Sequence, residues 1–89
     1  MKSRTVKSFR KAYRQLPDSV RRQAQSAYRL FVSDPYHSSL QFKLIRPEKR
    51  IYSVRIGLHY RALGIWDDDD IVWFWIGSHA DYDKLIEQL

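Results

Sequence analysis

The segment from Ile71 to Ile76 constrains the fold most, because all six of its residues are apolar. A short strand that is apolar at every position is typical of one covered on both faces, so this segment predicts a central strand of a sheet. Four consecutive aspartates, residues 67–70, precede it and predict a solvated hairpin turn. A helix-start pattern follows at once, so the strand is expected to lead directly into a short C-terminal helix.

Two amphipathic helices are predicted in the first third of the chain. In residues 5–16 the apolar side chains recur at helical spacing, and they are Val6, Phe9, Tyr13 and Leu16. Residues 19–33 have a second apolar face, made by Val20, Ala24, Ala27, Tyr28 and Phe31. Pro17 separates the two patterns, Asp18 is the expected N-cap of the second helix, and Pro35 ends it. The two helices are therefore expected to form a hairpin.

The rest of the chain predicts an antiparallel meander. The predicted strands, joined by short turns, are residues 40–45, 51–56, 60–66 and 71–76. Packing the helical hairpin on one face gives a single α+β domain over residues 1–89, with a four-stranded antiparallel sheet and a short C-terminal helix. Trp73 and Trp75 lie two residues apart, so both are expected on one side of the last strand, in the core. The sequence leaves open a further strand at residues 2–5.

The charge of the chain is unevenly distributed. Its 16 Lys and Arg residues outnumber 10 Asp and Glu, which gives a net charge of +6. Residues 1–34 carry +7, residues 35–66 carry +5 and residues 67–89 carry −6. Such a basic body predicts binding to nucleic acid or to an acidic protein. There is no cysteine, which excludes a thiol nucleophile, and no apolar run spans a bilayer, so a cytoplasmic protein without membrane contact is expected.

His79 is the first candidate for chemistry, because it lies where the apolar strand meets the C-terminal helix. Ser78 and Asp81 form a capping-box pattern, which makes Ser78 the expected N-cap and His79 the first helical residue. A helix N-terminus disfavours the charged imidazolium, and a neutral imidazole can accept a proton, as a general base must. The alternative interpretation is a surface histidine at a helix start.

Arg55 and Arg61 are expected on neighbouring strands across a short turn, with both guanidiniums on one face of the sheet. Together they could hold a phosphate and stabilise a pentavalent transition state. Alternatively they are solvated arginines that extend over an apolar face. Tyr82 follows His79 by one helical turn, where it would stack on a base or orient a phosphate, or else belong to the core.

Further basic side chains gather on the first predicted hairpin and in the following turn. Those expected to contact RNA are Lys43, Arg46, Lys49, Arg50 and His59. A charged hairpin tip that is merely solvated is the alternative. The aspartates at residues 67–70 lack the spaced ligands and the glycine of a calcium loop, so no metal site is predicted there.

Three short motifs stand in a fixed order along the chain. They are Tyr52-Ser53-Val54-Arg55-Ile56, Tyr60-Arg61-Ala62-Leu63 and Ile76-Gly77-Ser78-His79-Ala80-Asp81-Tyr82. Together with the order of two helices, an antiparallel sheet and a short C-terminal helix, they resemble the RelE/ParE toxin superfamily of bacterial type II toxin–antitoxin systems. The last motif is similar to that of the YafQ-type mRNA interferases.

The resemblance implies an endoribonuclease that enters the ribosomal A site and cleaves messenger RNA by attack of the 2′-hydroxyl, without a metal or other cofactor. By the same resemblance His79 is the general base or acid and Arg61 binds the scissile phosphate. Arg55 would support the developing charge, and Tyr82 would stack or orient. The implied partners are a cognate antitoxin, mRNA and the ribosome with its 16S rRNA. The basic surface over residues 1–66 would attract an acidic or disordered antitoxin segment.

The chain departs from the family pattern at the second acid–base group. Residues 37–41 hold no carboxylate where YoeB-type relatives place a glutamate, and His59 stands about where YafQ-type relatives have an aspartate. His37 or His59 would then have to act with His79. Two other functions stay open: a ParE-like toxin that inhibits DNA gyrase, and a catalytically degenerate basic binding domain. Gyrase inhibitors generally lack a histidine at the position of His79, which favours the nuclease.

Overall fold

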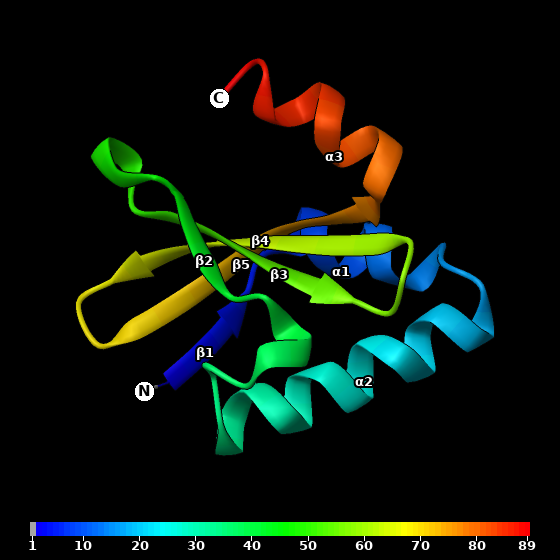
Figure 1. Cartoon of the computed structure of the whole chain (residues 1–89). Helices are drawn as coiled ribbons and strands as arrows, with labels where there is room; N and C mark the ends of the chain where they lie inside the picture. Colours follow the sequence, from blue (N-terminus) through cyan, green and yellow to red (C-terminus); the bar gives the residue numbers. More distant parts are fainter. Residues whose placement is uncertain (1) are drawn as a thin grey trace.

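A computed structural model describes residues 2–89. It contains one five-stranded sheet, and helices lie on both faces of this sheet (Figure 1). The helices are α1 (Lys7–Arg14), α2 (Asp18–Ser33) and α3 (His79–Ile86), and two short 3-10 turns are η1 (Ser38–Leu40) and η2 (Pro47–Lys49). The strands are β1 (Lys2–Thr5), β2 (Lys43–Arg46), β3 (Ile51–Ile56), β4 (Tyr60–Asp67) and β5 (Asp70–Ser78). Their order across the sheet is β1-β5-β4-β3-β2. Over residues 2–89, none of the helices has the length and apolar character needed to cross a membrane.

Strand β1 makes the sheet mixed, so the prediction of a four-stranded antiparallel sheet is wrong on this point. It pairs in parallel with β5, with Lys2 opposite Asp70 and Thr5 opposite Trp73. The segment is short and polar, and it becomes a strand through its partner rather than through an apolar pattern of its own. Ser3 illustrates this, because its Oγ accepts a hydrogen bond of 2.8 Å from Nε1 of Trp73.

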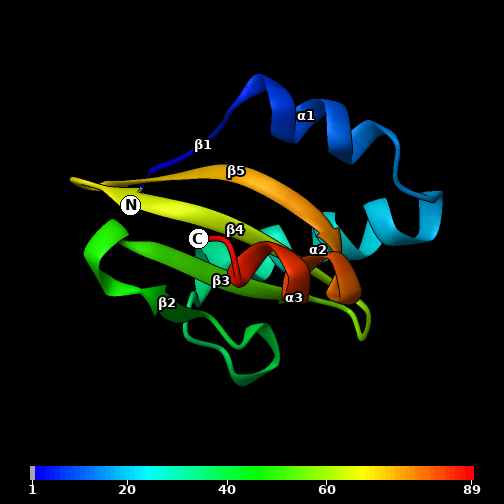
Figure 2. The same ribbon diagram turned by 90° about the horizontal axis from the view of Figure 1, so that it is seen from above.

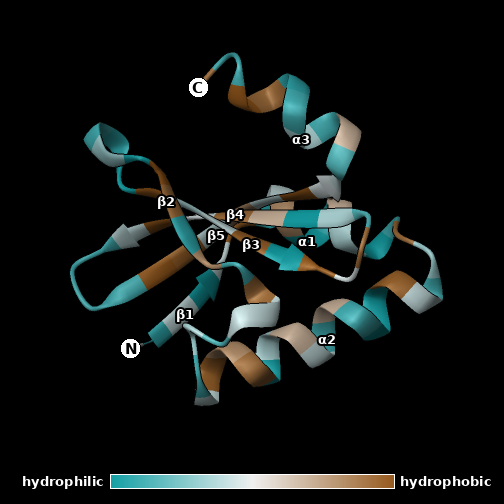
Figure 3. Ribbon diagram, viewed as in Figure 1, coloured by the Kyte–Doolittle hydropathy of each residue, from teal (hydrophilic) through white to brown (hydrophobic). Residues whose placement is uncertain are grey.

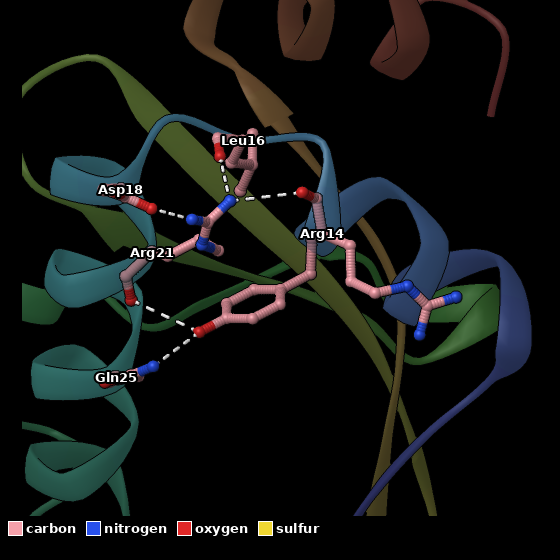
Figure 4. Close-up of polar contacts among 6 residues, drawn as sticks. Arg14, Leu16, Asp18, Arg21 and Gln25 are labelled. Carbon is pink, nitrogen blue, oxygen red and sulfur yellow. Dashed lines mark hydrogen bonds and ion pairs between the residues drawn. The ribbon is translucent and has the colours of Figure 1, made fainter.

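The helical hairpin is confirmed, with changes at its ends. Helix α1 starts at Lys7, because Thr5 belongs to β1 and Val6 is the N-cap of α1. Asp18 is the first residue of α2 and Pro17 is the N-cap, so the predicted cap is wrong by one position. Asp18 instead forms an ion pair with Arg21, whose guanidinium also donates to the carbonyls of Arg14 (3.1 Å) and Leu16 (Figure 4). These contacts hold the turn between the two helices.

The strand predicted at residues 40–45 begins late, at Lys43. Leu40 closes the turn η1 instead and points into the main core, where it is buried. Gln41 then adopts a left-handed backbone with φ of 46°, which an extended strand does not permit. The chain therefore changes direction at Gln41 before it joins the sheet.

The main core lies between the sheet and helices α1 and α2. Phe31 of α2 packs edge-on against Trp73 of β5, with ring centroids 5.3 Å apart, and Val54, Ile56 and Ile76 surround them. Figure 2 shows α1 lying alongside β5, and Figure 3 shows hydrophobic bands on the strands and on α2. Each fully buried side chain of this size contributes about 1.5–3 kcal/mol, so this layer carries most of the hydrophobic stabilisation.

A second, smaller core lies on the opposite face, beneath α3. Leu63 of β4 and Tyr82 of α3 are buried there, and Trp75 packs against them. The prediction that Trp73 and Trp75 share a side is wrong, because β5 has a bulge: Leu63 pairs with Trp75, whereas Gly64 pairs with Trp73. The extra residue between them reverses the alternation of side chains. Strand β5 is covered on both faces, as its apolar run predicted.

Candidate functional site

The backbone around His79 is held by two hydrogen bonds where β5 passes into α3. Oγ of Ser78 accepts a hydrogen bond of 3.1 Å from the amide of Asp81, so the predicted N-cap is confirmed. The amide of His79 itself donates to the carbonyl of His59 in the β3–β4 turn, at 2.7 Å. The backbone that carries the imidazole is therefore fixed at the C-terminal end of β5. The His79 side chain is about half exposed.

Arg61 lies on β4 with its side chain turned toward His79. Its Nε donates to Nδ1 of His79 at 3.3 Å, and its Nη2 donates to Oε1 of Gln41 at 3.1 Å. The guanidinium carbon also lies 5.3 Å from the centre of the Tyr82 ring. Arg61 is only 9% exposed, and within residues 2–89 its buried Nη1 has no hydrogen-bond partner. This arginine is thus oriented by three neighbours and keeps one unsatisfied donor.

The contact with Arg61 determines which nitrogen of His79 carries its proton. A guanidinium can only donate, so Nδ1 must supply a lone pair, and the proton of the neutral imidazole lies on Nε2. Nε2 in turn lies 3.6 Å from a carboxylate oxygen of Asp83, one helical turn along α3. His79 is therefore flanked by a cation at Nδ1 and an anion at Nε2. Protonation of Nδ1 would set two donors against each other, so it requires Arg61 to move.

Tyr82 lies closer to the core than its expected role requires. Its ring is 5.8 Å from that of His79 between centroids and 6.5 Å from that of Trp75. Only 5% of the residue is exposed, which leaves almost no ring face for stacking on a base. Of the two expected roles, the geometry favours orientation, because the ring supports the guanidinium of Arg61 by a cation–π contact.

Arg55 pairs directly with Arg61 across the β3–β4 ladder, as the sequence predicted for neighbouring strands. The two side chains nevertheless make different contacts. Nε of Arg55 donates to the carbonyl of Gly57 in the β3–β4 turn, at 2.8 Å, whereas Arg61 turns toward His79. The expected pair of guanidiniums around one phosphate is therefore not preformed.

The residues predicted to contact RNA fall into two groups. Lys43, Lys49, Arg50 and His59 are exposed on β2, around η2 and in the β3–β4 turn, so they are available to a ligand. Arg46 is different, because its guanidinium donates to the carbonyls of Ile86, Leu89 (3.3 Å) and Ile45 (2.8 Å). Arg46 thus fastens the C-terminal end of α3 to the sheet.

The structure adds Gln41 and Asp83 to the site. The position of Asp83 four residues after His79 on a helix was a usable signal, since such pairs face each other. Gln41 gave no signal, because its left-handed backbone and its reach to Arg61 depend on the tertiary structure. His37 does not join the cluster: its Nδ1 accepts the amide of Ser39 within η1. Over residues 2–89, no three His, Asp or Glu side chains gather as metal ligands do.

Comparison with known proteins gives a family and a fold. A family model described as a ParE-like toxin domain matches residues 18–84. No curated protein matches the chain. The RelB–RelE antitoxin–toxin complex from Methanococcus jannaschii contains a similar chain, with a TM-score of 0.73 and 18% identity, covering 92% of this chain and 96% of that one.

Two other solved structures show the same fold. YafQ from E. coli strain BL21(DE3) matches with a TM-score of 0.67 and 11% identity, over 90% of this chain and 94% of that one. A YoeB/ParE toxin from Agrobacterium tumefaciens matches with a TM-score of 0.67 and 15% identity, over 89% of this chain and 99% of that one. Because the family model covers most of the sequence and the fold agrees over nearly its whole length, the chain belongs to the ParE-like toxin domain family, within the RelE/ParE superfamily of type II toxins.

Proposed function

We propose that this toxin is an endoribonuclease that cleaves mRNA on the ribosome without a metal ion. The observation that carries the proposal is the contact between Arg61 and His79 at the end of the sheet. It brings an anion-binding group and a titratable group together on rigid elements, which is the minimum that phosphodiester cleavage by the neighbouring 2′-hydroxyl requires.

The proposed reaction is an internal transesterification. The 2′-oxygen forms a new bond to phosphorus and the bond to the 5′-oxygen breaks, giving a 2′,3′-cyclic phosphate and a free 5′-hydroxyl. One proton leaves the 2′-hydroxyl and one is delivered to the 5′-oxygen. Neutral His79 offers a lone pair at Nδ1 for the first transfer and a proton at Nε2 for the second, and His59 in the adjacent turn is the candidate for whichever role His79 does not take.

Arg61 would bind the scissile phosphate and stabilise the charge of the pentavalent transition state. Its buried Nη1 has no partner among residues 2–89, and an anionic oxygen would supply one if the guanidinium turned outward. A phosphate that drew the guanidinium toward itself would also release Nδ1 of His79. Binding of the substrate phosphate to Arg61 would then also free Nδ1 of His79 to act as the base.

The proposed protein partner is a cognate antitoxin with an acidic, amphipathic segment. Relatives from Methanococcus jannaschii and E. coli were crystallised as complexes with a RelB antitoxin. In the present chain an apolar cavity of about 350 Å³ opens between α1, α2 and the sheet, lined by aromatic residues such as Phe9, Tyr13 and Trp73. Residues 1–34 around it carry a net charge of +7. An antitoxin segment with apolar side chains would fill the cavity, and acidic residues beside them would match the basic charge around it.

The test is induced expression in a bacterial host, followed by primer extension on an abundant translated message. The proposal expects breaks at codon-registered positions with the native toxin, none with His79→Ala, and none when translation is blocked. His37→Ala is the matched control, because His37 caps η1 outside the cluster, and it should still cleave. Growth arrest without cleavage would contradict the proposal and favour a gyrase-type target.

A further inference from the structure

A second basic feature begins beside the proposed catalytic site. An open groove of about 670 Å³ lies between α2, from Ser19 to Leu30, the turn η1 and the β3–β4 turn. In Figure 1 the β3–β4 turn lies next to α2, at the end of the sheet where α3 begins. Arg55 lines this groove and is also the cross-strand partner of Arg61. Arg55 therefore places one side of the groove next to the strand that carries the proposed phosphate-binding residue.

The rim of the groove is basic and rich in hydroxyl groups. Arg22 from α2 faces it together with Arg55, and the hydroxyls come from Ser19, Ser26 and Ser39. Among the lining residues that the structure describes, there is no Asp or Glu. The neighbouring Arg21 does not contribute, because it is committed to the α1–α2 turn (Figure 4). Guanidinium and hydroxyl donors without a competing carboxylate are suited to a phosphate.

The floor of the groove is apolar. Ala27 and Leu30 from α2 and Leu40 from η1 form it, and Leu58 from the β3–β4 turn adds an exposed apolar side chain beside it. Leu58 is 74% exposed, so its side chain is accessible to a ligand in the groove. A basic rim above an apolar floor matches one nucleotide, whose phosphate takes the rim while its base or ribose covers the floor.

We propose that this groove binds the nucleotide next to the scissile phosphate, with Arg55 and Arg22 holding its backbone phosphate and Leu58 contacting its base or ribose. The inference rests on the proposed nuclease function, since it extends the RNA away from Arg61. Adjacent strands are about 4.8 Å apart, so a chain that leaves Arg61 reaches Arg55 within one nucleotide. The pairing of Arg55 with Arg61 on adjacent strands favours RNA over an acidic peptide as the ligand.

The test measures binding rather than cleavage. A fluorescent single-stranded hexaribonucleotide, 2′-O-methylated throughout so that it cannot be cleaved, is titrated with the purified toxin at several salt concentrations. Arg22→Ala should weaken binding by about tenfold and lower the salt slope by about one. Arg14→Ala is the matched control, because it removes the same charge from α1 outside the groove and should change binding less than about twofold.

Leu58→Ser provides an independent check, because it keeps the charge and alters only the apolar contact. It should weaken binding without changing the salt slope. Equal losses in Arg22→Ala and Arg14→Ala, or no binding by the native toxin at low salt, would overturn the proposal. So would an Arg22→Ala defect seen with an acidic peptide but not with the RNA. Groove-dependent binding by a native toxin that cuts no message would refute the nuclease function alone.

Discussion

Nε of Arg61 donates to Nδ1 of His79 over 3.3 Å, and this hydrogen bond joins β4 to the first residue of α3. The nitrogen that would accept a proton in catalysis is therefore already engaged by Arg61. While Arg61 donates to this lone pair, Nδ1 cannot accept a proton from the substrate. The anion-binding residue thus controls access to the base, and any change at Arg61 should affect both roles together.

Arg61→Lys tests this coupling while preserving the charge. A lysine ammonium cannot make the forked contacts to His79 and Gln41, so cleavage on the ribosome should fall by about 100-fold or more, as when one preorganised donor is lost. The ¹⁵N spectrum of His79 should show the Nε2–H tautomer in the native protein and a changed Nδ1 signal in the variant. Arg55→Lys is the control, because Arg55 does not contact His79, and it should leave that signal in place. An unchanged Nδ1 signal in Arg61→Lys would contradict the coupling.

Gln41→Glu should weaken substrate binding. The new carboxylate would replace a neutral hydrogen bond to Nη2 of Arg61 with a charge-assisted one and would compete with the scissile phosphate. The difference between such hydrogen bonds is about 1–2 kcal/mol, so the KM for cleavage should rise by about tenfold. Gln41→Ala, which removes the acceptor without adding charge, should raise KM much less. Faster cleavage by the Glu variant would show instead that a carboxylate here acts as a base.

The sequence predicted most of the elements because their signals are local. The apolar run of β5, the capping box at Ser78 and the helical stripes all depend on near neighbours. What it left open or did not predict depends on tertiary partners. The polar segment Lys2–Thr5 becomes a strand only beside β5, and Trp73 and Trp75 separate only because a bulge lies between them.

In the candidate site, too, the sequence identified the residues that local motifs mark and missed those that depend on tertiary contacts. Arg61, His79 and Tyr82 were found from motif and spacing, and the structure brings them together. The commitment of Arg46 to the end of α3 could not be read from a charged hairpin, because the carbonyls it binds are 40 or more residues away in the chain. Gln41 was missed for the same reason.

Gly64→Ala should destabilise the fold at the bulge. A Cβ at this position would lie 2.8 Å from Cε3 of Trp73 and 2.9 Å from Cγ1 of Ile71, and both neighbours are buried. Such overpacking typically costs about 1–3 kcal/mol in the free energy of unfolding. Urea denaturation followed by tryptophan fluorescence measures it, with Ser8→Ala on the exposed side of α1 as the control. An unchanged midpoint in Gly64→Ala would mean that the bulge can relax without loss.

Ser78→Ala should affect stability and cleavage together. It removes the hydroxyl that accepts the amide of Asp81, and loss of such a cap costs about 1 kcal/mol. Because His79 is the first residue of α3, fraying of this turn also loosens the imidazole, so cleavage should decrease at temperatures where the protein is still folded. Ser78→Thr retains the hydroxyl and should restore most of both properties. Full cleavage by a destabilised Ser78→Ala would show that the cap does not position His79.

Arg46→Ala and Lys49→Ala should separate a structural role from a binding role on the same hairpin. Arg46 is half-buried and donates to Ile86 and Leu89, so its removal leaves carbonyls of α3 without a partner and should cost about 1–3 kcal/mol in unfolding free energy. Lys49 is exposed at η2, and its removal should change stability by less than about 0.5 kcal/mol. Ribosome binding, measured by co-sedimentation at two salt concentrations, should weaken in Lys49→Ala in a salt-dependent way. The prediction would be wrong if Arg46→Ala were stable but bound the ribosome poorly and Lys49→Ala unfolded early. Arg46 would then belong to the RNA-binding surface.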